Sequence, residues 1–249
     1  MRKGYTVSRF FLTPEDSIET NKIVLRGENH HHLSRVLRAR VGEAVEVCDG
    51  KGTDYFCRCA SFEKECAHLS IEQVAQSAAE NGPKVTLYQC IAKGEKMEQI
   101  ITRTVEMGVY RIVPVLSRFC VARPEQAEKK LERWRKIALS AAKQSGRGLV
   151  PEIAPIMDIK DAIEEMAKTP KAFVCFEKEE KQTLAEFEMG QEVSFLIGSE
   201  GGLSDEECTM WEQKGIGAVT LGSRILRTEN AAAYVLPVLF YKLQTEVRS

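Results

Sequence analysis

The segment that decides the fold is Phe195-Leu196-Ile197-Gly198-Ser199-Glu200-Gly201-Gly202-Leu203-Ser204. An apolar run is followed directly by a loop that holds three glycines and one acid. A short apolar run bounded by turn residues is typical of a strand buried in a parallel sheet. Glycines at the end of such a strand let backbone N–H groups approach a ligand closely. A plain strand-to-helix turn seldom needs three glycines, so we interpret this loop as part of a binding site.

Around this segment, apolar runs alternate with amphipathic stretches from residue 84 to the C-terminus. The expected strands cover 84–91, 111–115, 172–176, 193–197 and 218–221. Helical spacing marks the segments near 97–105, 127–142, 159–167 and 204–213, and a last helix from Thr228 that Pro237 should kink or shorten. Such alternation predicts an α/β domain with a mostly parallel sheet. Ligands bind beyond the carboxyl ends of such strands, so the loops after Ile197 and Leu221 are the expected site.

The second of these loops is Leu221-Gly222-Ser223-Arg224-Ile225-Leu226-Arg227-Thr228-Glu229-Asn230. Its apolar pair, Ile225 and Leu226, stands where a loop should be polar. The pair suits either a flat aromatic ligand or burial under a neighbouring loop. The chain contains no GxGxxG, GxxxxGK[ST] or GxSxG sequence. A Rossmann cofactor site, a P-loop ATPase and an α/β-hydrolase are therefore unsupported.

Residues 1–76 have a different pattern, with short alternating runs and turn residues. The run 44–48 alternates, Asp49-Gly50-Lys51-Gly52 is typical of a turn, and 55–59 completes a hairpin. A further alternating run at 68–74 and a short helix at 32–38 complete the pattern of a small β-barrel. The small and polar residues 77–83 form the expected linker, which leaves 84–249 as the second domain.

Composition excludes several classes of protein. The 249 residues are 43% hydrophobic and 29% charged, which is typical of a globular protein. The longest apolar run, 231–241, is too short to span a bilayer, and no apolar segment follows Met1 as in a secretory signal. We therefore interpret the eight cysteines as reduced and the protein as cytoplasmic.

The sequence predicts no metal site. No CxxC occurs, and Cys57-x-Cys59 has no second ligand pair at metal spacing. Three consecutive histidines, His30 to His32, cannot easily converge on one ion, so we interpret them as a solvated or RNA-facing patch. His68 lies on an expected strand and is interpreted as structural.

The net charge of −1 conceals an uneven distribution. Residues 1–42 carry a net charge of +4 and residues 118–147 one of +6, whereas residues 158–192 carry −5. Two basic segments on a neutral chain indicate a polyanionic partner, although solvated helix faces explain the charges equally well.

Seven motifs, taken together and in this order, resemble the RsmE family, the bacterial 16S ribosomal RNA uracil-N3 methyltransferases of the SPOUT superfamily. They are Arg9-Phe10-Phe11, His31-His32-Leu33 with Val36-Leu37-Arg38, Asp49-Gly50-Lys51-Gly52, Lys96-Met97-Glu98 with Glu106-Met107-Gly108-Val109, Gln144-Ser145-x-Arg147, Ile197-Gly198-Ser199-Glu200-Gly201-Gly202, and Leu221-Gly222-x-x-Ile225-Leu226-Arg227-Thr228-Glu229. The resemblance spans the whole chain.

The resemblance implies a PUA-like RNA-binding barrel followed by a SPOUT-type parallel-sheet domain with a trefoil knot, a rare exception to the rule that chains do not thread loops. It also implies S-adenosylmethionine as cofactor, a homodimer, no membrane association, and 16S ribosomal RNA in the small subunit as substrate. Carried over by position, the cofactor-binding residues are Phe176, Leu196, Gly198, Glu200, Gly201, Gly202, Leu221, Gly222, Ile225, Leu226 and Arg227.

Chemistry then assigns expected roles. Uracil N3 must lose a proton before it is methylated, and an arginine beside a uracil oxygen would stabilise the developing anion. Arg227 is expected to stabilise this anion. Glu229 or Glu200 is expected either to accept the proton or to position the reacting groups. The residues expected to contact RNA are Arg9, His31, Arg35, Arg38, Arg40 and Arg147.

Three positions depart from the family pattern, which usually has Pro at Ser199, Lys at Arg103 and a small Thr- or Ser-like residue at Asn230. Two other SPOUT activities compete with the expected one: methylation of transfer RNA and methylation of a ribose hydroxyl. A catalytically idle RNA-binding assembly factor and a metabolite-binding α/β protein are the more distant alternatives. The latter leaves the basic segments unexplained.

Overall fold

The computed structural model describes residues 8–121 and 126–246, with side chains described as far as Lys242. It divides into two compact units. Unit 1 contains the chain up to Asn81 together with Gly146–Val150, and unit 2 contains Gly82–Ser145 and the chain from Pro151 onward. Three cations of the basic segments, Arg2, Lys3 and Arg123, lie outside the described residues.

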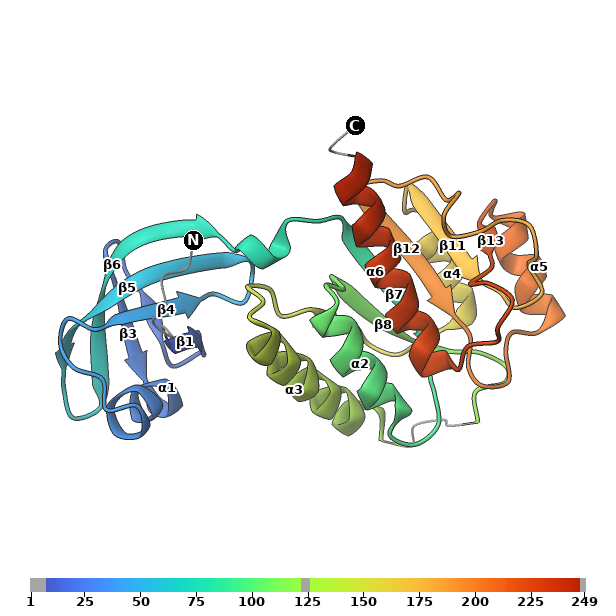
Figure 1. The fold of residues 1–249 in the computed structure, drawn as a ribbon. Helices are drawn as coiled ribbons and strands as arrows, with labels where there is room; N and C mark the ends of the chain where they lie inside the picture. The colour runs from blue at the N-terminus through green and yellow to red at the C-terminus, as the bar shows by residue number, and fades with distance from the viewer. Residues whose placement is uncertain (1–7, 122–125, 247–249) are drawn as a thin grey trace. The chain divides into compact units, whose positions relative to one another are not determined.

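Unit 1 is built on a six-stranded sheet in the order β1-β4-β5-β6-β3-β2 (Figure 1). Its strands are β1 (Ser8–Phe11), β2 (Ser17–Ile18), β3 (Lys22–Arg26), β4 (Ala44–Cys48), β5 (Thr53–Phe62) and β6 (Cys66–Gln76). The expected hairpin is present as β4 and β5, which pair antiparallel around the Asp49–Gly52 turn. A short helix, α1 (Gly27–His31), continues into a π-helical turn at His32–Val36.

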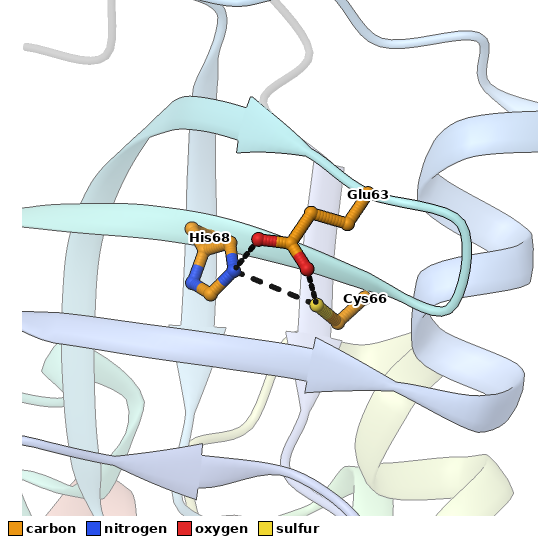
Figure 2. A group of neighbouring side chains, drawn as sticks. All are labelled: Glu63, Cys66 and His68. Atoms are coloured by element: carbon orange, nitrogen blue, oxygen red, sulfur yellow. Dashed lines mark hydrogen bonds and ion pairs between the residues drawn. The ribbon is translucent and has the colours of Figure 1, made fainter.

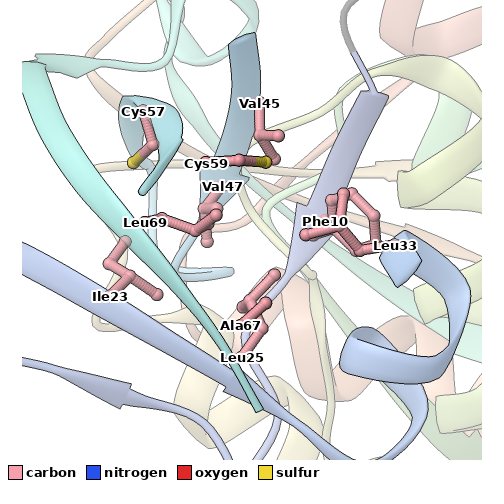
Figure 3. Close-up of a cluster of buried hydrophobic side chains, with 10 residues drawn as sticks. All are labelled: Phe10, Ile23, Leu25, Leu33, Val45, Val47, Cys57, Cys59, Ala67 and Leu69. Carbon is pink, nitrogen blue, oxygen red and sulfur yellow. The ribbon is translucent and has the colours of Figure 1, made fainter. Parts of the chain in front are cut away.

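The inward side chains of this sheet form one apolar cluster (Figure 3). It consists of Phe10, Ile23, Leu25, Leu33, Val45, Val47, Cys57, Cys59, Ala67 and Leu69. Because strands from both halves of the sheet order contribute to the same cluster, the sheet must curl around it. Alternation explains the pattern, since successive residues of a strand point to opposite faces.

A short return segment, Gly146–Val150, is fastened to unit 1. Gly52 N–H donates to the carbonyl of Gly148 at 2.9 Å, and Val150 N–H donates to that of Gly50 at 2.9 Å. The carboxylate of Glu80 accepts hydrogen bonds from Arg147 Nη2 (2.7 Å) and from the backbone N–H groups of Gly148 (3.0 Å) and Leu149 (3.1 Å). One half-buried carboxylate and two backbone hydrogen bonds therefore hold the segment.

Unit 2 contains a seven-stranded sheet in which every paired strand is parallel. The order is β10-β8-β7-β12-β11-β13, with β9 paired to β8. The strands are β7 (Lys84–Cys90), β8 (Arg111–Leu116), β9 (Glu152–Ile153), β10 (Met157–Asp158), β11 (Lys171–Cys175), β12 (Glu192–Ile197) and β13 (Gly217–Val219). The sheet confirms the predicted α/β class. Its carboxyl ends bring the two glycine-containing loops to one edge.

Helices cover both faces of this sheet. They are α2 (Lys96–Glu106), α3 (Ala127–Ser145), α4 (Ile159–Met166), α5 (Asp205–Gln213) and α6 (Thr228–Glu246). Helix α6 packs against α2, β7 and β12, while α4 packs against α5 and β8 behind the sheet (Figure 1).

The final helix is not shortened at Pro237, since α6 continues through that residue to Glu246. Pro237 lies on an exposed side of α6, where water can satisfy the carbonyl that proline leaves unpaired. In the part of the chain that the structure describes, no helix combines the length and apolar character that a membrane crossing requires.

We predict that Glu80→Ala destabilises unit 1 by about 3 kcal/mol, because it removes the carboxylate that bonds the buried Arg147 guanidinium and two backbone N–H groups. Urea unfolding followed in Glu80→Ala and wild type measures this. Glu72→Ala is the matched control, since the Arg58–Glu72 pair has both side chains 51% exposed and such pairs contribute about 1 kcal/mol or less. Equal losses in the two variants would contradict the assigned role of Glu80.

Candidate active site

The predicted capping box fixes the exit of the glycine loop. Ser204 Oγ accepts from Glu207 N–H at 3.3 Å, and Glu207 Oε2 accepts from Ser204 N–H at 2.8 Å. The backbone N–H groups of Ser204 and Glu207, which have no partner within the helix, are therefore both hydrogen-bonded, as a capping box requires. The other oxygen of Glu207 accepts from Arg118 N–H at 2.7 Å, which ties the loop after β8 to the same helix end.

Two glycines of this loop are required by its path: Gly202 forms a turn, and Gly201 packs closely against Phe119. Gly202 N–H donates to the carbonyl of Ser199 at 3.0 Å, and Gly202 has a φ of +71°, in the left-handed region. A Cβ on Gly201 would lie 2.8 Å from Cβ of Phe119, closer than packed carbon atoms come. The loop can therefore keep this path only with glycine at both positions.

A buried hydrogen-bond chain connects this loop to the sheet and to the last helix. Gln89 Nε2, at the end of β7, donates to Thr228 Oγ1 at 2.9 Å, and Thr228 Oγ1 donates to the carbonyl of Gly198 at 2.8 Å. Gln89 is fully buried and Thr228 is buried at the start of α6. These bonds hold the first turn of α6 against the glycine loop, so the two predicted binding loops meet.

Lys96, the first residue of α2, joins the two predicted catalytic acids. Its Nζ lies 2.9 Å from Glu200 Oε1 and 3.9 Å from Glu229 Oε2. The hydrogen bond to Glu200 raises the pKa of Lys96, while the nearby charge of Arg227 lowers it. Burial opposes ionisation of Glu200, but bonds from Lys96 and from the backbone N–H of Lys93 outweigh it and hold the pKa of Glu200 below its usual value. The two acids thus share one cation.

The two acids differ in how their oxygens are satisfied. Glu200 accepts from Lys96 and, at 3.1 Å, from Lys93 N–H. Glu229 is 8% exposed, and its Oε2 is buried without a hydrogen-bond partner among the described residues. An unsatisfied buried carboxylate oxygen is costly, so Glu229 is a candidate for a functional role.

Arg227 stands immediately before α6 with its side chain exposed. Its carbonyl accepts from the N–H groups of Asn230 (2.8 Å) and Ala231 (2.9 Å) and begins the helix. Arg103 Nη1 donates to Asn230 Oδ1 at 2.9 Å, so two of the residues expected to depart from the family pattern contact each other.

The remaining predicted cofactor residues lie around the same edge of the sheet. Phe176 N–H donates to the carbonyl of Val219 at 3.1 Å, which joins the ends of β11 and β13. In the second loop Gly222 has a φ of +102° and open space where a Cβ would stand, Leu226 is half-buried, and Ile225 is 88% exposed. Leu196 is fully buried in β12, so its side chain belongs to the core.

The residues expected to contact RNA fall into two groups. His31, Arg35, Arg38 and Arg40 are exposed on unit 1 around the π-helical turn and the segment that follows it. Arg9 instead forms ion pairs with Glu46 and with Asp54 (2.6 Å), and Arg147 pairs with Glu80 at 2.7 Å. The structure gives both of these arginines an intramolecular role, and their contact with RNA stays a prediction.

Sequence reasoning did not assign Lys96 or Gln89 to the site. Lys96 stands in one of the motifs that carry the family resemblance, but its use depends on two acids more than 100 residues away. Gln89 carries a clearer signal: it is an amide within the fully buried last four residues of β7, between Tyr88 and Cys90. A buried amide in such a strand indicates a required hydrogen bond.

Two family models match the chain. The model described as RNA methyltransferase domain matches residues 79–239, and the one described as RNA methyltransferase PUA domain matches residues 25–67. The chain is 30% identical to the ribosomal RNA small subunit methyltransferase E of Bacillus subtilis over 97% of this chain and 98% of that protein.

Solved structures agree with these matches. The chain is similar to a ribosomal RNA small subunit methyltransferase E from Neisseria gonorrhoeae bound to S-adenosyl methionine, with a TM-score of 0.78 and 32% identity, covering 96% of this chain and 97% of that one. It is also similar to a putative methyltransferase from Legionella pneumophila in complex with the same cofactor, with a TM-score of 0.80 and 28% identity, covering 96% and 98% of the two chains. These similarities confirm the predicted fold class.

We predict that Gly201→Ala weakens S-adenosylmethionine binding by about tenfold, because the added methyl group forces Phe119 and the glycine loop apart. Calorimetric titration of the cofactor into the variant and the wild type measures the change. Gly217→Ala is the control, since a Cβ at Gly217 meets no atom within 4 Å. Unchanged affinity in Gly201→Ala would show that the loop path is not needed for binding.

Proposed function

Since this chain belongs to the RNA methyltransferase family that includes ribosomal RNA small subunit methyltransferase E, we propose that it transfers a methyl group from S-adenosylmethionine to N3 of a uridine in 16S ribosomal RNA of the small ribosomal subunit. The observation that carries this proposal is the meeting of the two glycine-containing loops beside a buried, unsatisfied carboxylate oxygen. Fold class alone would not suffice, because one fold hosts many activities.

The residues at this edge of the sheet fit S-adenosylmethionine. Glycine is required at Gly201 and Gly202, as the close approach of Phe119 and the positive φ show, and Ser199 Oγ is buried without a hydrogen-bond partner in the described residues. When bound, the cofactor supplies a methyl group on a positively charged sulfur. The residues proposed to hold it are Phe176, Leu196, Gly198, Glu200, Gly201, Gly202, Leu221, Gly222, Ile225, Leu226 and Arg227, with Leu196 and Arg227 contributing backbone groups.

Glu229 is the proposed proton acceptor. Uracil carries a proton on N3, and its removal turns N3 into a nucleophile. Glu229 Oε2 has no hydrogen bond to give up, whereas Glu200 is held by Lys96 and Lys93. A buried acceptor with no hydrogen bond to break suits a general base, although Lys96 lies 3.9 Å away. Glu200 and Lys96 then act as positioning residues, since Lys96 lies between the two acids.

Arg227 is proposed to stabilise the anion that forms when N3 loses its proton. Negative charge then develops on the uracil oxygens, and a fixed guanidinium beside one of them lowers the barrier. Arg227 is exposed and stands one residue before the buried Thr228, so its backbone is anchored while its side chain is free to reach a substrate.

The RNA is proposed to contact unit 1 through the exposed His31, Arg35, Arg38 and Arg40, with the ion-paired Arg9 and Arg147 as further expected contacts. Arginines of this kind position a nucleic acid through its phosphates without reading its sequence. The exposed apolar residues Val36 and Leu37, 58% and 41% exposed, lie among these arginines and suit contact with sugars or bases. Uridine within folded RNA would have to be extruded to reach the methyl donor.

We further propose the trefoil knot and the homodimer. After β13, at one edge of the sheet, the chain crosses back to α6 over the central strands β7 and β12, and Thr220 N–H bonds to Gln182 in the β11–β12 connection on the way. This route supports threading through that connection. Exposed Tyr234 of α6 (46%) and Ile225 (88%) support a partner on this side of unit 2. We place the enzyme in the cytoplasm, with its substrate.

The deciding experiment incubates the purified protein and labelled S-adenosylmethionine with undermethylated small subunits, naked 16S RNA and transfer RNA. We expect N3-methyluridine, identified by nucleoside mass spectrometry, from the small subunits. A different methylated nucleoside would retain the methyltransferase and overturn the N3 assignment. Cofactor and RNA binding without transfer to any substrate would favour an idle assembly factor.

We predict that Glu229→Gln lowers turnover by roughly 10²- to 10⁴-fold and Arg227→Ala by about 10²-fold, while cofactor affinity changes by less than about threefold. Glu229→Gln removes only the proton-accepting charge, and Arg227→Ala only the guanidinium. Single-turnover methylation measures the loss of turnover, and calorimetric titration of the cofactor measures any change in affinity.

Arg224→Ala serves as the control, since Arg224 is an exposed arginine of the same loop that takes no part in the proposed mechanism. Parallel losses of turnover and of cofactor affinity in Arg227→Ala would reassign that residue to binding. Full turnover in Glu229→Gln would exclude it as the base.

A further inference from the structure

Three side chains of different chemistry meet outside the methyltransferase site, at the tip of the hairpin formed by β5 and β6. Glu63 precedes the turn, Cys66 follows it, and His68 lies two residues further along β6 (Figure 2). In the part of the chain that the structure describes, these three form the only group of histidine, cysteine and acidic side chains with metal-binding spacing.

The hairpin itself brings the three together. Cys66 and His68 lie on one face of β6, because strand residues alternate, and Ala67 and Leu69 between and after them enter the apolar core. Glu63 N–H donates to the carbonyl of Cys66 at 2.8 Å, which closes the turn and places Glu63 opposite Cys66. Cys66 and His68 are half-buried and Glu63 is exposed, so the group is accessible from solvent.

The distances between the donor atoms match those around a tetrahedral ion. Cys66 Sγ lies 3.5 Å from His68 Nε2 and 3.5 Å from Glu63 Oε2, and His68 Nε2 lies 3.0 Å from Glu63 Oε1. Zinc bond lengths of about 2.0–2.3 Å at tetrahedral angles require donor atoms roughly 3.4–3.6 Å apart. The two contacts of Glu63 use its two different oxygens, so its exposed carboxylate must rotate to bring a single oxygen into the ligand set, with all three donor atoms already within 4.8 Å of one another.

We propose that Glu63, Cys66 and His68 bind one divalent transition-metal ion of the zinc class, with a fourth coordination position open to solvent. The donor set suits this ion, because thiolate and imidazole select borderline metals over Mg²⁺ or Ca²⁺. A thiolate and a carboxylate together balance the two charges of the ion. Binding displaces the thiol proton of Cys66, which leaves to solvent.

The ligand spacing is E-x-x-C-x-H, which contains no pair of cysteines. This spacing explains why a search for CxxC pairs predicts no metal and why His68, taken alone, is interpreted as structural. All three ligands belong to unit 1 and none belongs to the methyl-transfer residues of unit 2. A metal bound there would link the two ends of the β5–β6 turn. Its fourth ligand could be a water molecule or a group from another molecule.

The test adds Co²⁺ to the full-length protein, reduced and freed of metal by chelation. We expect saturation at one equivalent, with a thiolate-to-cobalt charge-transfer band in the near ultraviolet and visible bands typical of tetrahedral cobalt. Zn²⁺ added afterwards should displace the cobalt and abolish both sets of bands. Absence of the charge-transfer band at one equivalent would overturn the proposal.

Three variants identify the ligands. Cys66→Ser should lose the charge-transfer band, and His68→Gln and Glu63→Gln should each weaken binding at least tenfold, since loss of even an outer partner of a metal ligand costs roughly 10- to 100-fold. Cys208→Ser is the control, because Cys208 is also half-buried but lies on α5 in unit 2.

A charge-transfer band that persists in Cys66→Ser, or disappears in Cys208→Ser, would place the metal elsewhere. Circular dichroism of each variant confirms that the fold is retained. Glu63→Gln keeps the test decisive if Cys66→Ser unfolds, since Glu63 is exposed and its substitution is nearly isosteric.

Discussion

The amide of Gln89 donates to the hydroxyl of Thr228, and that hydroxyl donates to the carbonyl of Gly198, at 2.9 and 2.8 Å. The two bonds join residues that stand 139 and 30 positions apart in the chain. Because the groups are buried, losing one partner would leave others unsatisfied at a cost of about 1–3 kcal/mol each. The glycine loop, the central strand β7 and the first turn of α6 are therefore fixed relative to one another, and the site depends on this.

These bonded segments also bring three charged side chains together, those of Lys96, Glu200 and Glu229. Lys96 approaches both Glu200 and Glu229, but only Glu200 makes a close bond with it. Glu229 keeps one buried oxygen without a hydrogen bond in the described part of the chain. In the proposed mechanism Glu200 has the positioning role and Glu229 the role of base, as different environments often divide acid and base roles between two carboxylates. Arg103 of α2 and Asn230 in the first turn of α6, both expected to depart from the family pattern, are hydrogen-bonded to each other.

The arginines of unit 1 that were expected to face RNA lie in two different environments. Unit 1 keeps three acids, Glu46, Asp54 and Glu80, paired with arginines that the sequence analysis expected to face RNA. The exposed arginines are those around the π-helical turn, where the chain packs only Leu33 into the core. Charge counting cannot separate these groups, because a buried arginine and an exposed one contribute equally to the net charge of a segment.

Local pattern alone determined the fold class, the major strands of the parallel sheet, the β4–β5 hairpin and the capping box at Ser204. These features depend on residues close together in sequence, whose spacing reports directly on burial and hydrogen bonding. The family motifs added the cofactor and the reaction. The short strands β9, β10 and β2, two residues each, gave no periodic signal and were not predicted.

Tertiary structure decided what local pattern could not. It brought Gly146–Val150 back to unit 1, let α6 pass through Pro237, placed Lys96 between two distant acids, and gathered Glu63, Cys66 and His68 at one hairpin tip. Each outcome depends on a partner far along the chain or across a turn. Sequence spacing encodes which face of an element is apolar, but it does not encode which distant polar group will meet that element once the core has formed.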